Sequence, residues 1–298
     1  MVPAVRALTA AGLKIGVLCH IEQADFWSAA GCGVVIPHSH LDWVRNIAHR
    51  LAGQWKAALC WHTGFAANCF SRAEIPVRMG PEDPGLRPRL TQTFKPLPPG
   101  PATHRVRFYL QALEEMGIPT RNPEFFQPLA GVGDGARPQS ETLLVTDSDF
   151  GTSHEWEIDR WESIARRLLE RGCQLHVAVA DSKRSSGHAL LKRLGTDANM
   201  WELGPVSGWL QRLAGFGRVF AVDGTLPHLA SLAGADCATW FGPNDPAWRR
   251  PLGRRHLVIQ QHVECAPCLA SKCRMNHRCM VELTADHAWS KISKWIES

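Results

Sequence analysis

The sequence predicts an α/β protein that consists of two doubly wound units. Short apolar runs of strand length alternate with segments of helical periodicity along most of the 298 residues, and this pattern is typical of parallel sheets covered by helices. A stretch rich in proline and glycine, residues 119–139, interrupts the alternation and is expected to be a linker. We therefore predict a first domain at residues 1–138 and a second at residues 139–298, each long enough to bury a core.

In the first half, a helix with apolar residues at helical spacing ends at Gly12. Thr63 and Gly64 directly follow a predicted strand, at the edge where open parallel sheets bind ligands. A helix cap explains either residue equally well. The other elements expected here are strands at residues 14–19, 33–36 and 57–61 and helices at residues 41–51 and 103–119.

In the second half, the alternation continues without interruption, so we expect a second parallel sheet. The predicted strands are residues 142–146, 173–180, 219–222, 238–241 and 258–260. The predicted helices are residues 189–194, 203–217 and 285–296, one that begins near Leu226, and one that carries Trp161, Ile164 and Leu168 at helical spacing and ends at Gly172.

The composition is that of a soluble globular protein, with 45% hydrophobic and 20% charged residues. No apolar stretch has the length of a membrane span, and the first residues lack the order of regions of a signal peptide. We therefore expect a cytoplasmic protein. The formal net charge of +5 favours anionic partners.

The turn after residues 219–222 is the strongest candidate for a ligand site. The strand leads directly into Asp223, Gly224 and Thr225, and a helix follows. Unpaired backbone N–H groups and the positive end of the helix dipole would meet at this turn, and both favour a phosphate. Many α/β proteins, however, carry Asp-Gly at a strand end only to make the turn.

This stretch resembles the donor-site segment of the glycosyltransferase family 9 heptosyltransferases. In that family an Asp-Ser/Thr-Gly-x-x-His turn precedes an alanine-rich helix and a Phe-Gly-Pro-x-Asp-Pro turn. The matching residues here are Asp223, Gly224, Thr225 and His228, followed by Phe241-Gly242-Pro243-Asn244-Asp245-Pro246. The threonine and the glycine stand in exchanged order.

Two further segments resemble the heptosyltransferase II group of this family. Residues 62–80 resemble its Asn-Ser-Phe-x-Ser-Ala turn, helix and Ile-Pro-x-Arg-x-Gly strand. Residues 151–157 resemble its Gly-x-Ser/Ala-Lys-x-Trp-Pro turn, with His154 in place of the lysine and Glu157 in place of the proline. A neutral histidine binds phosphate more weakly than an ammonium does. The resemblance extends over residues 2–292.

The resemblance implies a GT-B architecture, with two Rossmann-like domains that face a cleft. It also implies inverting transfer of a heptose from ADP-L-glycero-D-manno-heptose to the lipopolysaccharide inner core, without a metal in the chemistry. The acceptor would lie at the inner membrane surface, which leaves peripheral association with that membrane open. The implied donor-binding residues are Thr152, Ser153, His154, Asp223, Gly224, Thr225 and His228, and the implied acceptor-side residues are Thr63 and Gly64.

Structural roles remain open for two of these residues. Asp223 would contact the donor sugar or, at a buried strand end, accept hydrogen bonds that fix the turn. His228, one turn into the helix, would face the phosphates or serve the helix start alone.

The catalytic base is not assigned. In the family it is the aspartate of a Gly-Asp turn that precedes the first helix, and this sequence begins within that helix. Two explanations stay open: the start was placed too late, or the protein is a degenerate member that binds a sugar nucleotide without efficient transfer.

Four cysteines near the C-terminus have the spacing C-x2-C-x4-C-x5-C: Cys265, Cys268, Cys273 and Cys279. Four thiolates could hold a structural zinc or iron ion in a tetrahedral site. Reduced thiols in a surface loop are the alternative interpretation. We expect no nucleic-acid partner, because this loop lacks a recognition helix and interleaved aromatic residues.

Overall fold

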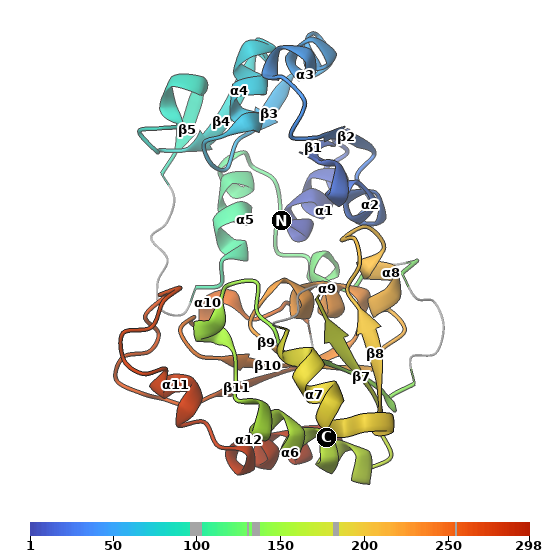
Figure 1. Cartoon of the computed structure of the whole chain (residues 1–298). Helices are drawn as coiled ribbons and strands as arrows, with labels where there is room; N and C mark the ends of the chain where they lie inside the picture. Colours follow the sequence, from blue (N-terminus) through green and yellow to red (C-terminus); the bar gives the residue numbers. More distant parts are fainter. Residues whose placement is uncertain (96–102, 130, 133–137, 181–184, 254) are drawn as a thin grey trace. The chain divides into compact units, whose positions relative to one another are not determined.

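The structure is a computed structural model, and it describes residues 1–95, 103–129, 131–132, 138–180, 185–253 and 255–298. The chain divides into two compact units, Met1–Phe126 and Gln127–Ser298. The division falls within residues 119–139, the stretch in which the sequence predicts a linker. Both units have the predicted α/β class, with parallel sheets (Figure 1).

Unit 1 contains two small parallel sheets. One pairs β1 (Gly16–His20) with β2 (Val34–His38), and the other has the order β3-β4-β5. The strands of this second sheet are β3 (Ala57–Leu59), β4 (Val77–Pro81) and β5 (Gln92–Phe94). The helices are α1 (Val2–Ala10), α2 (Ala24–Ala29), α3 (Val44–Leu51), α4 (Phe65–Arg72) and α5 (Val106–Glu115), with the short turns η1 (Ile21–Gln23), η2 (Arg87–Arg89) and η3 (Pro123–Phe126).

Unit 2 contains six parallel strands in the order β11-β10-β9-β6-β7-β8. The strands are β6 (Glu141–Val145), β7 (Gln174–Val179), β8 (Ala198–Glu202), β9 (Arg218–Val222), β10 (Asp236–Phe241) and β11 (His256–Gln260). The α-helices are α6 (Ile158–Glu170), α7 (Ser186–Leu194), α8 (Trp209–Leu213), α9 (Thr225–Ala233), α10 (Pro246–Arg249), α11 (Arg278–Val281) and α12 (Ala285–Glu297). Its described residues also form the 3-10 turns η4 (Thr152–His154) and η5 (Gly195–Asp197).

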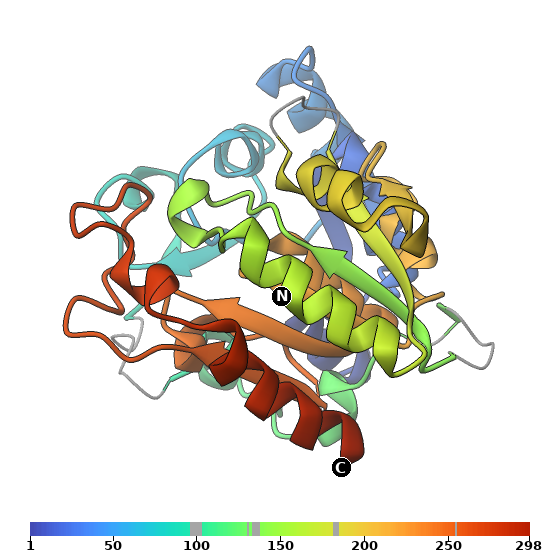
Figure 2. The ribbon, with the colours of Figure 1, turned by 60° about the horizontal axis from the view of Figure 1, so that its bottom comes forward.

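The core of unit 2 lies between the sheet and the helices α6 and α12, which run side by side over one face (Figure 2). Three buried tryptophans dominate it, with ring centroids 4.5 Å apart for Trp161 and Trp240 and 5.4 Å apart for Trp156 and Trp240. The indole N–H of Trp156 donates to the Leu283 carbonyl at 2.9 Å. Trp156 therefore fixes the end of the loop that follows β6.

Several details add to or differ from the sequence-based expectations, which did not include α2, β5, α10 and α11. The helix expected at residues 203–217 is only α8, because Gly208 adopts a left-handed conformation (φ 85°) and α8 begins directly after it. Strand β8 was not expected, since its residues are mostly exposed and form no apolar run. Helix α9 begins at Thr225, so Pro227 is its third residue, where the missing N–H still removes no intrahelical hydrogen bond.

Candidate functional site

The centre of the unit 2 sheet is a topological switch point. Strands β6 and β9 are neighbours there, and the order continues through β7 and β8 on one side and through β10 and β11 on the other. In open α/β sheets a ligand crevice forms outside the carboxyl ends of the two strands at such a point. We call residues 147–154, after β6, and residues 223–225, after β9, the switch-point site.

Asp223 ties the two loops of this site together. Its side chain is fully buried, and its Oδ2 accepts a hydrogen bond from the amide of Asn244. The hydroxyl of Ser148, on the other loop, donates to the Asp223 carbonyl at 2.6 Å. Within the described residues, Asp223 Oδ1 has no hydrogen-bond partner. A buried carboxylate oxygen without a partner is uncommon and is a feature of functional sites.

Helix α9 presents its N-terminus to the same edge. Gly224 is the N-cap residue, and the Thr225 N–H points out of the first turn. This N–H donates to Asp149 Oδ1 at 3.0 Å, and the Thr225 hydroxyl donates to Asp149 Oδ2. A carboxylate therefore occupies the position in which the helix N-terminus favours an anion.

Turn η4 forms the other wall. Gly151, which precedes it, has a φ of 103°, a conformation that glycine adopts without strain. His154 is buried, and its Nδ1 lies 3.7 Å from Asp223 Oδ2. Ser153 is buried as well, and its hydroxyl contacts the carbonyls of Ala270 and Ser271, so it is already engaged within the protein. Thr152 is exposed.

A positive charge lies beside η4. The guanidinium of Arg249, at the end of α10, lies 4.6 Å from the ring centroid of Phe150. The Phe150 ring in turn contacts the His154 ring edge to face, with centroids 5.5 Å apart. Among the described residues Arg249 forms no ion pair. Its charge is thus available to an anionic ligand.

The cysteine-containing loop, residues 261–277, contacts η4 and the turn after β10. It accepts the hydrogen bonds of Ser153, and its Cys268 N–H donates to the Pro243 carbonyl at 2.9 Å. The sulfur of Cys273 accepts backbone N–H bonds from Met275 and His277 at 3.2 and 3.1 Å. This loop therefore connects η4 to the turn that contains Asn244.

The thiols of this loop influence the pKa of Cys279, but in the described residues they are not grouped as metal ligands. Burial, followed by the neighbouring thiols of Cys265, Cys268 and Cys273, raises the pKa of Cys279 to about 11. In the described part of the chain, no three His, Cys, Asp or Glu side chains are grouped so that they could hold a metal ion. A zinc or iron site at the four cysteines stays a prediction.

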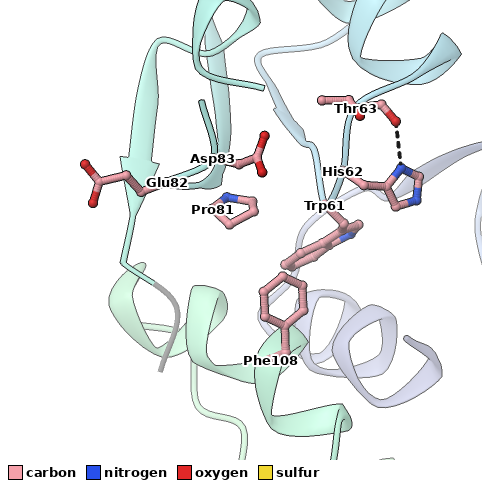
Figure 3. Close-up of a pocket in the computed structure, with 7 residues that line it drawn as sticks. All are labelled: Trp61, His62, Thr63, Pro81, Glu82, Asp83 and Phe108. Atoms are coloured by element: carbon pink, nitrogen blue, oxygen red, sulfur yellow. Dashed lines mark hydrogen bonds between the residues drawn. The ribbon is translucent and has the colours of Figure 1, made fainter. Parts of the chain in front are cut away.

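Unit 1 has a separate cavity of about 320 Å³ at the carboxyl ends of β3 and β4 (Figure 3). Trp61 and Phe108 provide its apolar wall, with ring centroids 5.9 Å apart. Figure 3 shows the carboxylates of Glu82 and Asp83 pointing to opposite sides. The complete lining is Trp61, His62, Thr63, Pro81, Glu82, Asp83 and Phe108.

A protein-family model matches residues 130–278, half of the chain, and its description is glycosyltransferase family 9 (heptosyltransferase). The chain belongs to glycosyltransferase family 9. No curated protein sequence matches it.

Solved structures of family 9 and related enzymes share the fold of this family 9 chain. Heptosyltransferase II of E. coli has 18% identity and a TM-score of 0.78, and the match covers 99% of this chain and 93% of the E. coli chain. A family 9 glycosyltransferase of Veillonella parvula has 12% identity, a TM-score of 0.79 and coverage of 100% and 93%. E. coli heptosyltransferase WaaC with ADP has 16% identity, a TM-score of 0.76 and coverage of 99% and 94%. The predicted fold class, α/β of the GT-B type, is confirmed.

The donor residues that the resemblance implies for this family 9 chain come from the two loops of the switch-point site and from α9. The structure places Thr152, Ser153 and His154 in η4, Asp223, Gly224 and Thr225 on the adjoining turn, and His228 in α9. Of the acceptor-side residues, Thr63 lines the unit 1 cavity, and Gly64 is the N-cap residue of α4.

Three polar residues of the family 9 site carry no role in the sequence-based assignment: Asp149, Asn244 and Arg249. Asn244 was part of the matched motif, but its position within the motif does not reveal that it binds Asp223. Asp149 lies two residues before the matched turn, and only the fold brings it to Thr225. Arg249 belongs to an arginine cluster that indicated an anionic partner in general terms.

Proposed function

We propose that this protein is a glycosyltransferase that uses ADP-L-glycero-D-manno-heptose as donor and a heptose of the lipopolysaccharide inner core as acceptor, with inversion at the anomeric carbon. The observation that carries the proposal is the switch-point site. There the N-terminus of α9, the buried pair His154 and Asp223, and the charge of Arg249 meet at one sheet edge. ADP in the structure of E. coli heptosyltransferase WaaC supports the donor class.

The chemistry requires stabilisation of the departing diphosphate. In our proposal the Thr225 N–H and hydroxyl bind its oxygens, since a helix N-terminus supplies both hydrogen-bond donors and a positive dipole. Arg249 adds positive charge beside η4, over the Phe150 ring that contacts His154. The proposed transfer takes place at the cytoplasmic surface of the inner membrane. No helix in the described residues has the length and apolar character to cross a membrane.

Asp223 has a positioning role in this proposal. Its contacts with Asn244 and Ser148 hold the two loops at a fixed separation. Its Oδ1, which has no partner in the part of the chain that the structure describes, is suited to a hydroxyl of the donor sugar, since a carboxylate accepts hydrogen bonds from sugar hydroxyls. His228 is assigned to the donor side by its place in the motif.

The unit 1 cavity is our candidate for the acceptor saccharide. Apolar faces of sugar rings pack against aromatic side chains such as Trp61 and Phe108, while carboxylates and hydroxyls such as those of Asp83 and Thr63 bind the sugar hydroxyls. The combination is typical of a small polar ligand with one apolar face. This supports the acceptor-side assignment of Thr63.

The direct test is an assay of transfer with ADP-heptose and a lipopolysaccharide acceptor that carries the first inner-core heptose. The proposal predicts release of ADP that depends on the acceptor, and an increase of one heptose in the acceptor mass. Calorimetric binding of ADP-heptose without either product would favour the alternative, a degenerate family member that binds a sugar nucleotide without efficient transfer. Absence of both binding and transfer would refute the proposed function.

A further inference from the structure

The N-terminus of α9 already holds an anion that belongs to the protein. Asp149 places both of its carboxylate oxygens against Thr225, one on the backbone N–H at 3.0 Å and one on the hydroxyl. Both residues are exposed, so a ligand in solution can reach the same donors. Asp149 thus uses the hydrogen bonds that the proposed function assigns to the diphosphate.

The carboxylate also fills the space over the turn. A Cβ atom built on Gly224 would lie 2.5 Å from Asp149 Oδ1, so this oxygen is positioned directly against the glycine. A phosphate oxygen cannot share that position. Two anions a few ångströms apart would also repel each other. Bound diphosphate and the observed position of Asp149 therefore exclude one another.

The turn does not depend on Asp149 for its shape. Asp223 is held by the Asn244 amide and by the Ser148 hydroxyl, and the same Ser148 oxygen accepts the Phe150 N–H at 3.1 Å. The backbone on both sides of Asp149 is fixed by these bonds. The Asp149 side chain can therefore rotate away while the turn and the N-terminus of α9 keep their geometry.

We propose that Asp149 is an internal competitor that sets the affinity of the donor site. In the resting protein its carboxylate occupies the α9 N-terminus, and the diphosphate of the nucleotide must displace it. The apparent affinity is then the intrinsic affinity multiplied by the fraction of molecules in which Asp149 has moved away. This inference rests on the proposed function, because it takes a nucleoside diphosphate as the ligand.

The test is calorimetric titration of the full-length protein with ADP in buffer that contains EDTA. Asp149→Asn removes the charge but keeps an acceptor, and Asp149→Ala removes both. We expect ADP to bind about 10-fold more tightly to both variants than to wild type, with the larger gain for Asp149→Ala. Asp286→Asn is the matched control, because Asp286 is an exposed carboxylate of the same unit that pairs with Arg167 on the helices away from the site. Its affinity for ADP should equal that of wild type.

Each other outcome has a distinct meaning. Equal ADP affinity in wild type and both Asp149 variants would overturn the inference and leave the proposed function intact. Weaker ADP binding by the variants would also overturn it. If Mg²⁺ then strengthened ADP binding to wild type but not to the variants, Asp149 would be a cation ligand instead. If no form of the folded protein binds ADP, the proposed function fails, and the inference fails with it.

Discussion

Substitution of Gly224 by alanine should weaken nucleotide binding while the fold is retained. The backbone of Gly224 is extended (φ 176°), a conformation that any residue adopts, so alanine adds no strain there. The new methyl group would lie 2.5 Å from the present position of Asp149 Oδ1, whereas ordinary contact begins at 3.4 Å. Asp149 is exposed and can turn away at little cost. A phosphate oxygen at that position would have to retreat by about 0.9 Å, beyond hydrogen-bond range of the Thr225 N–H.

A lost hydrogen bond to a charged group costs about 1.5–3 kcal/mol, so Gly224→Ala should raise the Kd for ADP by about 10- to 100-fold when it is compared in the Asp149→Ala background, where no gain from displacing Asp149 can offset the loss. Isothermal titration calorimetry measures this, and circular dichroism melting checks the fold. Gly215→Ala is the control, because its Cβ would make only an ordinary contact of 3.5 Å with the Arg212 carbonyl. Equal ADP affinity with and without Gly224→Ala in the Asp149→Ala background would refute the placement of the diphosphate at α9.

Three further predictions concern other parts of the molecule. Burial, together with the charge of Asp147, raises the pKa of Glu155 above its ordinary value, so stability is lost as the pH rises through the folded-state pKa. Glu155→Gln should therefore raise the Tm by about 2 °C at pH 7 and by less at pH 4. An equal shift of the Tm at both pH values would contradict the assignment. Thr63→Val should raise the KM for the acceptor by about 5- to 10-fold and leave ADP affinity unchanged, whereas a loss of ADP affinity would remove Thr63 from the acceptor side. A thiol reagent should label exposed Cys268 in the native protein, but it should label Cys237 only after unfolding, because Cys237 is buried and desolvation raises its pKa. Peptide mass spectrometry measures the labelling of each cysteine. Labelling of Cys237 in the native protein would show that the sheet opens.

The local pattern of the sequence was sufficient to predict the turn after β9. An apolar run that ends in Asp-Gly-Thr and leads into an alanine-rich helix specifies strand, turn and helix by local chemistry alone. The motif resemblance added that the loop after β6 belongs to the same site. In the structure, His154 Nδ1 lies 3.7 Å from Asp223 Oδ2, and the donor-binding role of these residues stays a prediction.

The contact between Asp149 and Thr225 was not predictable in this way. It joins residues 76 positions apart, and it depends on β6 and β9 being neighbours in the sheet. Strand order is set by how the helices pack on both faces, and no single segment encodes it. Edge strand β8 escaped prediction for a related reason, because an edge strand needs little apolar surface.

Hydrogen–deuterium exchange with and without saturating ADP tests most directly whether a nucleoside diphosphate binds at the switch point of the second sheet. The account predicts slower exchange in the peptides that cover residues 147–156 and 223–228, and unchanged exchange around the cavity of unit 1. Protection confined to residues 61–83, or no protection anywhere at saturating ADP, would contradict it.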